Sequence, residues 1–377
     1  MYLLLQKNNM MNIAKKNYTA AACVLLMLGT VYSIYAQTEV HGIFSHDVRW
    51  SIEDSPYLVT GDILVKENAK LSINAGVTII CAASPVPDTS IKQYDRADSF
   101  SVAIKIEGCL DCAGKKDNRI VFKPAEIRPG GNSWYGIVFK KAPDQYTEMA
   151  FTDICGAYFG ITAMECGPLI HNCIIEQNNI GINCLEKGNC RINNCIIADN
   201  FTAGIKTSSA NPVFNNNIIV FNRNNGLWCD GVSHITFQFN CLWGNSDGDF
   251  MECDPELGVP VVSGKKKTDS ADFAHNIRKN PVFAGSESDS IAVEKDLSLP
   301  TEKSRMADTA IGKILYSALP DSMAAKKRMG RHLRYSLSEY SPCINTGNPA
   351  REFTDANGTR NDMGIYGGLG AIEKNLK

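Results

Sequence analysis

Residues 172–182 read Asn-Cys-Ile-Ile-Glu-Gln-Asn-Asn-Ile-Gly-Ile, and two close copies follow: 194–205, Asn-Cys-Ile-Ile-Ala-Asp-Asn-Phe-Thr-Ala-Gly-Ile, and 216–227, Asn-Asn-Ile-Ile-Val-Phe-Asn-Arg-Asn-Asn-Gly-Leu. A glycine followed by an apolar residue also recurs before these copies, and Gly248 continues the series. The glycines stand at 136, 160, 181, 204, 226 and 248, so the steps are 24, 21, 23, 22 and 22 residues. A period near 22 residues indicates a repeat architecture.

Asparagine recurs with the same period in two further columns. The first column is Asn178, Asn200, Asn222 and Asn245, and the second is Asn172, Asn194, Asn216 and Asn240. Asparagine tolerates left-handed backbone geometry and bonds to nearby backbone groups, and stacked Asn side chains can bond one another along an axis. We therefore expect these residues at the bends of stacked repeats.

The apolar residues of the repeats stand in short β-branched runs, Ile174-Ile175, Ile196-Ile197 and Ile218-Ile219. Such runs, bounded by Asn and Gly, are typical of short strands and turns. The sequence has no Leu ladder of the leucine-rich kind, and tetratricopeptide or ankyrin units are longer and helical. Three short strands and three bends fill such a unit, which predicts an all-β parallel β-helix of roughly eight turns.

The segments on either side of the repeats set the expected boundaries. Segments 57–65, 70–80 and 102–122 show strand patterns, with bends at Gly61 and Gly76 and a loop at 82–100. After Phe250 the period is lost, and the spacing of apolar residues predicts a helix over 304–319. We divide the chain into a targeting segment (1–36), the β-helix (37–253), an irregular or helical insertion or cap (254–339) and a C-terminal segment associated with the β-helix (340–377).

The N-terminus has the features of a secretory signal peptide. Residues 1–36 contain no acidic residue, three Lys residues precede an apolar run at 18–35, and Ala36 is a small residue at its end. A basic, an apolar and a small-residue region in this order predict export and cleavage. A retained membrane anchor is the alternative, because the run is just long enough to span a bilayer. After cleavage we expect no membrane span, and a periplasmic, cell-surface or extracellular location.

Composition narrows the function classes. The 377 residues carry 38 basic and 40 acidic side chains, a net charge of −2, which argues against nucleic-acid binding. Removal of 1–36 leaves 14 − 1 = 13 cysteines, so at least one would be unpaired within the chain. Cys173, Cys195 and Cys241 fall beside the Ile runs, where buried Cys acts as a small apolar filler. Export also permits disulfides between stacked cysteines.

Three further stretches complete a family resemblance. They are Gly61-Asp62-Ile63 through Gly76-Val77, Asn280-Pro281-Val282-Phe283, and the ending 341–347 with 361–368, Ser-Pro-Cys-Ile-Asn-Thr-Gly and Asn-Asp-Met-Gly-Ile-Tyr-Gly-Gly. With the repeats, they resemble the right-handed parallel β-helix proteins of the pectate-lyase-like superfamily, most closely the exported bacterial type. The resemblance implies a right-handed β-helix, here with a partly helical C-terminal insertion, and a carbohydrate as the substrate class. The Gly-His-Gly and Arg-Ile-Lys motifs of polygalacturonase-like members are absent from the sequence.

Strand alternation nominates one outward face of the repeats. If the Ile after each Gly points inward, the next residues point outward: Thr162, Asn183, Lys206 and Trp228, followed two residues on by Met164, Leu185, Ser208 and Asp230. We expect Asn183, Lys206, Trp228 and Asp230 to bind a ligand. Trp can stack on a sugar, Lys can meet a uronate, and Asp can accept sugar hydroxyls or bind calcium. The alternative is an ordinary solvent face, with Trp228 covered by the C-terminal insertion.

The stretch 355–362 alternates oxygen-bearing side chains around a glycine. Asp355, Asn357 and Asp362 are calcium candidates, and a plain Asn-Gly turn is the alternative. His171 and His234 are isolated in sequence and are expected to be packed or hydrogen-bonded.

Three function hypotheses follow. The leading one is noncatalytic binding of a polysaccharide or cell-surface glycan, or another surface interaction. The first alternative is a polysaccharide lyase or glycoside hydrolase with a diverged site, in which Lys206 and Asp230 are the catalytic candidates. The second alternative is a structural envelope protein. The sequence leaves open whether the protein is an enzyme, and calcium is the only cofactor it suggests.

Overall fold

The structure is a computed structural model that describes residues 37–82, 102–127, 130, 132–143, 147–261, 271–284 and 334–368. Contacts divide the chain into residues 1–37 and residues 38–377, and the strands β1 to β24 lie in the second unit. The expected targeting segment, the expected helix and nearly all of the expected loop at 82–100 lie outside the described residues. Within the described residues, no helix is long and apolar enough to cross a membrane.

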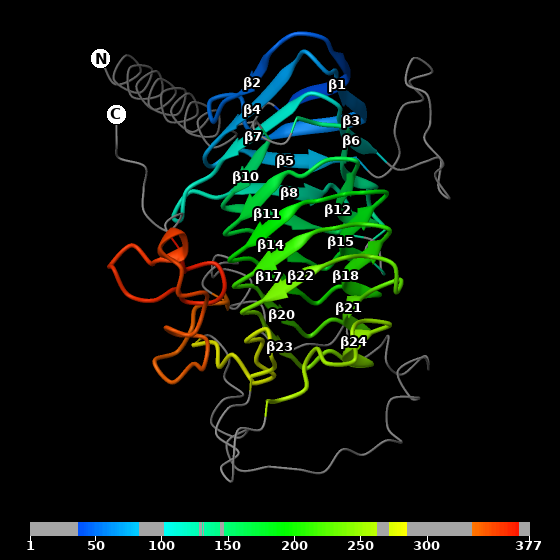
Figure 1. Cartoon of the computed structure of the whole chain (residues 1–377). Helices are drawn as coiled ribbons and strands as arrows, with labels where there is room; N and C mark the ends of the chain where they lie inside the picture. The colour runs from blue at the N-terminus through cyan, green and yellow to red at the C-terminus, as the bar shows by residue number, and fades with distance from the viewer. Residues whose placement is uncertain are drawn as a thin grey trace, which may run out of the picture. The chain divides into compact units, whose positions relative to one another are not determined.

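Each turn of the chain forms three short strands. In one turn, β13 (Leu169–His171), β14 (Ile174–Glu176) and β15 (Ile180–Leu185) follow one another along the sequence. The next strand, β16 (Arg191–Asn193), pairs with β13 in parallel. Each turn therefore stacks on the previous one, and the strands follow in chain order from blue to yellow in Figure 1. This arrangement confirms the predicted parallel β-helix.

The strands form three ladders, each named here after its member in that turn. The β13 ladder is a sheet of eight strands: β2 (Val48–Trp50), β4 (Lys70–Asn74), β7 (Cys109–Ala113), β10 (Glu148–Ala150), β13, β16, β19 (Val213–Asn215) and β22 (Thr236–Gln238). The β14 ladder contains β5 (Thr78–Cys81), β8 (Ile120–Pro124), β11 (Thr152–Cys155), β14, β17 (Ile196–Ala198), β20 (Ile218–Val220) and β23 (Cys241–Trp243). The β15 ladder contains β1 (Thr38–Phe44), β3 (Tyr57–Val65), β6 (Ala103–Ile106), β9 (Gly136–Lys140), β12 (Phe159–Met164), β15, β18 (Ala203–Ser208), β21 (Asn225–Trp228) and β24 (Gly248–Met251).

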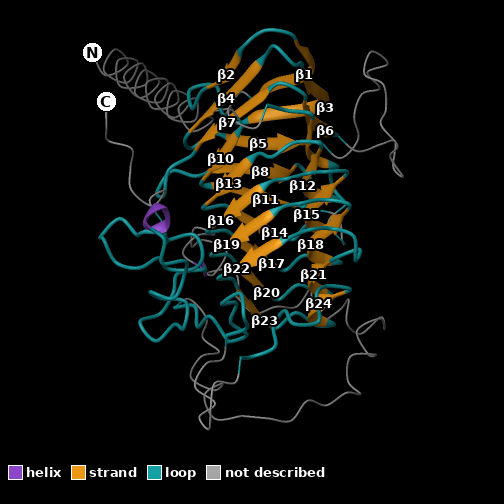
Figure 2. Ribbon diagram, in the orientation of Figure 1, coloured by secondary structure: helices purple, strands orange, loops and turns teal. Residues whose placement is uncertain are grey.

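Strand β3 joins the β14 and β15 ladders. Its first residues pair with β5 and its last residues pair with β6. Gly61 lies inside β3 between these two pairings, so the bend expected there is replaced by a change of partner. Gly76 does lie at a turn, with φ of 83°. Figure 2 shows strands and loops almost throughout the described residues, with one short 3-10 helix, η5 (Arg351–Phe353).

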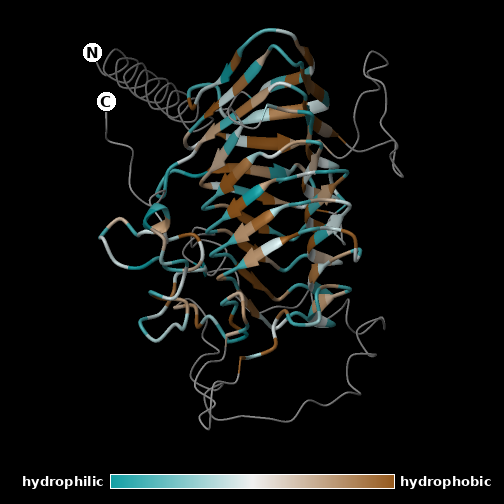
Figure 3. Cartoon of the chain, viewed as in Figure 1, coloured by the Kyte–Doolittle hydropathy of each residue, from teal (hydrophilic) through white to brown (hydrophobic). Residues whose placement is uncertain are grey.

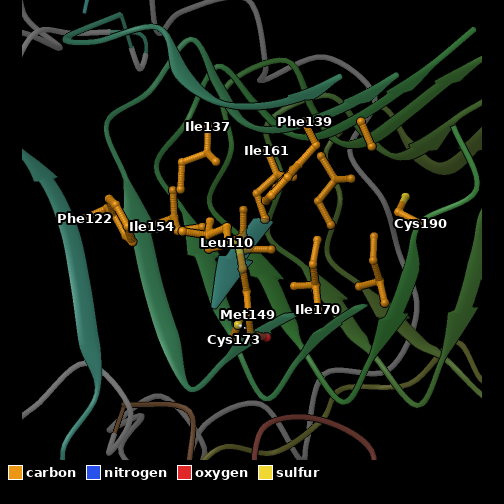
Figure 4. Close-up of a cluster of buried hydrophobic side chains, with 14 of the residues drawn as sticks. Leu110, Phe122, Ile137, Phe139, Met149, Ile154, Ile161, Ile170, Cys173 and Cys190 are labelled. Carbon is orange, nitrogen blue, oxygen red and sulfur yellow. Dashed lines mark hydrogen bonds between the residues drawn. The ribbon is translucent and has the colours of Figure 1, made fainter. Parts of the chain in front are cut away.

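The core fills the space between the three ladders. Ile170 of β13, Ile175 of β14 and Ile182 of β15 are fully buried in it, and Figure 4 shows equivalent side chains of neighbouring turns converging there. Brown strands in Figure 3 trace the same apolar positions along the stack. Each isoleucine buried in this way stabilises the fold by roughly 1.5–3 kcal/mol, so the regular spacing of apolar residues sets the register of the turns.

The first Asn column forms a buried ladder between β14 and β15 and their equivalents. From Asn200 onward each member accepts two hydrogen bonds from the Asn of the preceding turn; Asn200, for example, donates its backbone N–H (3.1 Å) and Nδ2 (2.9 Å) to Oδ1 of Asn222. The glycine column makes room for these amides, because a Cβ on Gly204 would lie 2.7 Å from Nδ2 of Asn222. Gly248 does not extend that column: it pairs with Asn225. The step to this turn is 23 residues, not 22, so Gly248 stands one residue before the position opposite Gly226.

The second Asn column contains two different sets of residues. Asn172, Asn194 and Asn216 have positive φ and lie at bends. Asn240 belongs instead to a ladder one residue further on, where Oδ1 of Asn240 accepts the backbone N–H of Asn217 at 3.0 Å. This corrects the expected alignment of Asn240 with Asn216.

The cysteine column needs the same correction. Cys241 pairs with Ile218 and therefore does not align with Cys173 and Cys195, which occupy the position of Asn217. All three cysteines are fully buried, as expected of apolar filler.

Both Asn ladders end on an aspartate at the C-terminal end of the stack. Nδ2 of Asn245 donates to Oδ1 of Asp249 at 2.8 Å, and Nδ2 of Asn276 donates to Oδ2 of Asp272 at 3.0 Å. A carboxylate only accepts hydrogen bonds, so it ends each ladder without leaving a buried donor unpaired. Arg278 also bonds to Asp249 (2.6 Å).

The two isoleucines of each repeat face different cores. The second points into the solenoid, whereas the first, as in Ile174, Ile196 and Ile218, forms a separate apolar cluster on the outer face of the β14 ladder. Residues from the described C-terminal stretches, among them Met363 and Ile365, pack on this face. In Figure 1 these stretches lie beside the β14 ladder, in orange and red.

Candidate functional site

The predicted outward ladder is present on the β15 ladder. Thr162 lies opposite Asn183, Asn183 opposite Lys206, and Lys206 opposite Trp228 on consecutive turns. Thr162 and Asn183 are only 4% and 3% exposed, and Oγ1 of Thr162 and Oδ1 of Asn183 have no hydrogen-bond partner among the described residues. Lys206 and Trp228 are half-buried. Of these four positions, only Lys206 and Trp228 are partly accessible.

Lys206, Trp228 and Glu252 form a compact group at the C-terminal turns. Nζ of Lys206 lies 4.1 Å from the centroid of the Trp228 ring, a distance at which a cation is attracted by the π face. Nε1 of Trp228 donates to Oε2 of Glu252 at 3.4 Å. Met251, opposite Trp228 on β24, is 37% exposed. One aromatic ring, one cation and one carboxylate thus share a surface of neighbouring turns.

Sequence reasoning missed Glu252. The residue follows the outward position of β24, and the misplaced Gly248 shifted that turn by one residue. Aligning Phe250 with Leu227 by their apolar character would have placed Met251 beside Trp228 and Glu252 next to it.

The carboxylate of Asp230 is held by hydrogen bonds within the solenoid. Its Oδ2 accepts the backbone N–H of Ser209 at 2.7 Å. Its Oδ1 accepts from N of Val232 (3.1 Å) and from both N (2.9 Å) and Oγ (2.8 Å) of Ser233. Partial burial pushes the pKa of Asp230 upward, but these hydrogen bonds outweigh burial and lower the pKa to about 2. The carboxylate therefore anchors the turn after β21.

The three calcium candidates lie in one turn of the C-terminal segment. Asp355 accepts the backbone N–H groups of Gly368 (2.6 Å) and Asp362 (3.0 Å), and Asn357 accepts N and Oγ1 of Thr359. Burial raises the pKa of Asp355 and of Asp362. The Asn357 contacts are local to the Asn-Gly turn, whereas those of Asp355 join it to the end of the segment. Among the described residues no three His, Cys, Asp or Glu are grouped to hold a metal.

A second polar cluster clamps the C-terminal segment onto the β14 ladder. The hydroxyl of Tyr335 donates to Oε2 of Glu176 at 2.7 Å, and Nη2 of Arg334 donates to Oδ2 of Asp199 at 2.6 Å. Burial raises the pKa of Asp199; Arg334 opposes this rise and Glu176 adds to it. Glu176 is 1% exposed, so this carboxylate serves the contact between segments. Nothing in the sequence near Glu176 signals a partner 159 residues away.

His171 belongs to a third contact with the same segment. Asn172 donates Nδ2 to the backbone oxygens of Ile365 and Gly367 (both 3.0 Å), which leaves its Oδ1 to accept from Nδ1 of His171 at 2.8 Å. Nε2 of His171 lies 2.8 Å from Oε1 of Glu148. Both ring nitrogens therefore donate, which is the imidazolium form. The prediction that His171 is hydrogen-bonded is confirmed, whereas His234 is exposed.

These observations define the class of the protein: a parallel β-solenoid whose three ladders are joined by short bends and whose outer face carries an aromatic and charged group. Residues 125–267 match the family model described as "Right handed beta helix region". The described turns within this range form a right-handed parallel β-helix, and the match covers fewer than half of the 377 residues. No curated protein and no solved structure matches the chain.

Proposed function

We propose that this is an exported β-helix protein that binds a carbohydrate without cleaving it, on the outer face of β18, β21 and β24. The observation that carries the proposal is the group formed by Lys206, Trp228 and Glu252, with the ammonium 4.1 Å from the Trp ring centroid and the carboxylate at the indole N–H. A rigid protein surface that carries an aromatic ring, a cation and a carboxylate can bind a sugar through its apolar face, its charge and its hydroxyls.

Each member of the group has a separate task in this proposal. The Trp228 ring offers an apolar face and an N–H donor, a combination suited to surfaces that meet a partially apolar ligand. Lys206 carries a point charge that can pair with the carboxylate of a uronic acid. Glu252 accepts hydrogen bonds and can bind sugar hydroxyls. The ligand expected from this set is an acidic polysaccharide.

The state of Asp230 supports binding without cleavage. Glycosidases use two carboxyl groups, one of which is kept protonated by a raised pKa so that it can act as an acid. Asp230 has a pKa lowered to about 2, and its oxygens already accept four hydrogen bonds from its own turn and the preceding one. Such a carboxylate is a weak base and is ionised at neutral pH.

Export is part of the proposal and rests on the N-terminal sequence. The basic residues, the apolar run at 18–35 and Ala36 have the order of a signal peptide. The resemblance of the chain to the pectate-lyase-like superfamily supports carbohydrate as the ligand class.

A binding screen tests the proposal. The purified protein is titrated with neutral and uronate-containing polysaccharides, and new reducing or unsaturated ends are measured in the same samples. We expect binding without products, and a loss of affinity of at least about tenfold, equal to ~1.4 kcal/mol, in Trp228→Ala and Lys206→Ala. Trp243→Ala is the matched control, because Trp243 is 40% exposed on the β14 ladder. Product formation, or equal loss in the control, would contradict the proposal.

A further inference from the structure

Two cysteines directly follow residues of the candidate site in the sequence. Cys229 follows Trp228, Cys253 follows Glu252, and their sulfur atoms lie 2.7 Å apart. The two cysteines belong to consecutive turns, and the backbone N–H of Cys229 donates to the carbonyl of Met251 at 2.9 Å. Neighbouring strands are spaced about 4.8 Å apart, which lies within the Cα separation that a disulfide bond spans.

The environment of this pair differs from that of a second close pair. The sulfurs of Cys184 and Cys190 are also 2.7 Å apart, but both residues are fully buried and belong to one turn. Cys253, by contrast, is half-buried, so a soluble oxidant can reach it. Accessible thiols react and buried ones are inert.

Electrostatics in the accessible pair favour the same residue as the nucleophile. The hydrogen bond with Cys229 is the main cause that lowers the pKa of the Cys253 thiol, and burial opposes it. The same hydrogen bond and burial raise the pKa of the Cys229 thiol. The thiolate is the reactive form of cysteine, so the more exposed of the two residues is also the one whose thiol ionises more easily.

We propose that Cys229 and Cys253 form a disulfide bond that ties the last two turns of the solenoid together beside Trp228 and Glu252. The oxidant is a disulfide, either a small molecule or an oxidoreductase. The Cys253 thiolate attacks one sulfur of the oxidant, which releases one thiol and leaves a mixed disulfide. The Cys229 thiolate then attacks the sulfur of Cys253 and expels the second thiol. The two cysteine protons pass to the two released thiols, and the oxidant gains the two electrons.

The bond has a consequence for the site. It joins the residues that follow Trp228 and Glu252, so the indole and the carboxylate are held on adjacent turns at the end of the stack. Strand β24 is the edge of its sheet and, among the described residues, pairs with β21 alone. The attachment of this strand depends on that single interface. The bond itself does not require that this face binds a glycan.

Peptide mapping tests the pairing. The purified full-length protein is incubated with glutathione disulfide, free thiols are alkylated with iodoacetamide, and the digest is examined by mass spectrometry without reduction. We expect a cross-linked peptide that contains Cys229 and Cys253 and disappears on treatment with dithiothreitol. Cys109, which is half-buried, is the internal control and is expected as a mixed disulfide or an alkylated residue. Recovery of Cys229 and Cys253 as separately modified residues would overturn the proposal.

Thermal unfolding supplies a second readout. We expect the oxidised protein to melt at a higher temperature than the reduced protein, and this difference to vanish in Cys253→Ser. Cys109→Ser is the matched variant and should keep the full difference. An equal loss in both variants would overturn the assignment of the bond to Cys253. Neither readout involves a carbohydrate, so failure here is distinguishable from failure of the binding proposal.

Discussion

Oδ1 of Asn222 accepts both the backbone N–H and the side-chain Nδ2 of Asn200, at 3.1 and 2.9 Å. Nδ2 of Asn222 in turn donates to the carbonyl of Ile197 and to Oδ1 of Asn245. One buried amide thus bonds to the turn before it and the turn after it. Because buried polar groups are costly when unpaired, such a ladder fixes the register of consecutive turns.

Replacing Asn222 by Ala should destabilise the solenoid strongly. The change removes the acceptor of the backbone N–H of Asn200 and of one of its two Nδ2 hydrogens, the other being bonded to the carbonyl of Ile175. An unpaired buried group costs about 1–3 kcal/mol. We expect a loss of about 3 kcal/mol or more in the free energy of unfolding, measured by urea titration. Asn224→Ala is the control, because Asn224 lies two residues further along the chain and is half-buried. It should change stability by about 0.5 kcal/mol or less. Similar losses in both variants would show that the ladder has no special role.

The glycine column can be tested through its contact with the same amide. A Cβ on Gly204 would lie 2.7 Å from Nδ2 of Asn222 and 2.8 Å from the carbonyl oxygen of Gly226, so Gly204→Ala should cost roughly 1–3 kcal/mol through overpacking. In the double variant Gly204→Ala/Asn222→Ala the clash with the amide is gone. In a double-mutant cycle, the loss of stability in the double variant should therefore be smaller than the sum of the losses in the two single variants. Strict additivity would refute the steric link.

Tyr335→Phe should loosen the C-terminal segment. The change removes the hydroxyl that donates to Glu176, a carboxylate only 1% exposed, and hydrogen bonds to charged groups contribute roughly 1.5–3 kcal/mol. We expect faster limited proteolysis between 334 and 368, with the solenoid core still protected. Tyr340→Phe is the control because Tyr340 is 80% exposed. Unchanged cleavage in Tyr335→Phe would mean that the apolar contacts alone hold the segment.

His171 should make stability depend on pH near neutrality. Burial lowers the pKa of His171, but the hydrogen bonds with Glu148 and Asn172 outweigh burial, and the pKa is raised above its ordinary value of 6.5 in the folded protein. The unfolded chain has the ordinary value, so the contribution is fully present below about pH 6.5 and is lost as the pH rises through the folded pKa. The free energy of unfolding, measured between pH 6 and 9, should therefore decrease as the pH rises. His171→Gln should flatten the profile and His234→Gln should not; a profile that His171→Gln leaves unchanged would place the titration elsewhere.

The sequence predicted the features that depend on neighbouring turns. Parallel stacking repeats the same contacts every 22 residues or so, and consequently Ile175, Asn200 and Gly204 each have equivalents one period away. The outward ladder of Lys206 and Trp228 followed from strand alternation within that register. The alignment failed only where a turn gained a residue, at Asn240, Cys241 and Gly248, because a one-residue insertion has no signature in a column of similar residues.

By itself, then, the sequence determined the parallel β-helix, its period and the face that carries Lys206 and Trp228, because these depend on contacts between positions one turn apart. Only the tertiary structure decided that Ile174 and its equivalents lie under the C-terminal segment, that Asp230 is engaged by its own turn, and that Glu252 stands beside Trp228. The contact of Tyr335 with Glu176 joins residues 159 positions apart. Such contacts depend on how a nonrepeating segment packs against the solenoid, and no local periodicity encodes them.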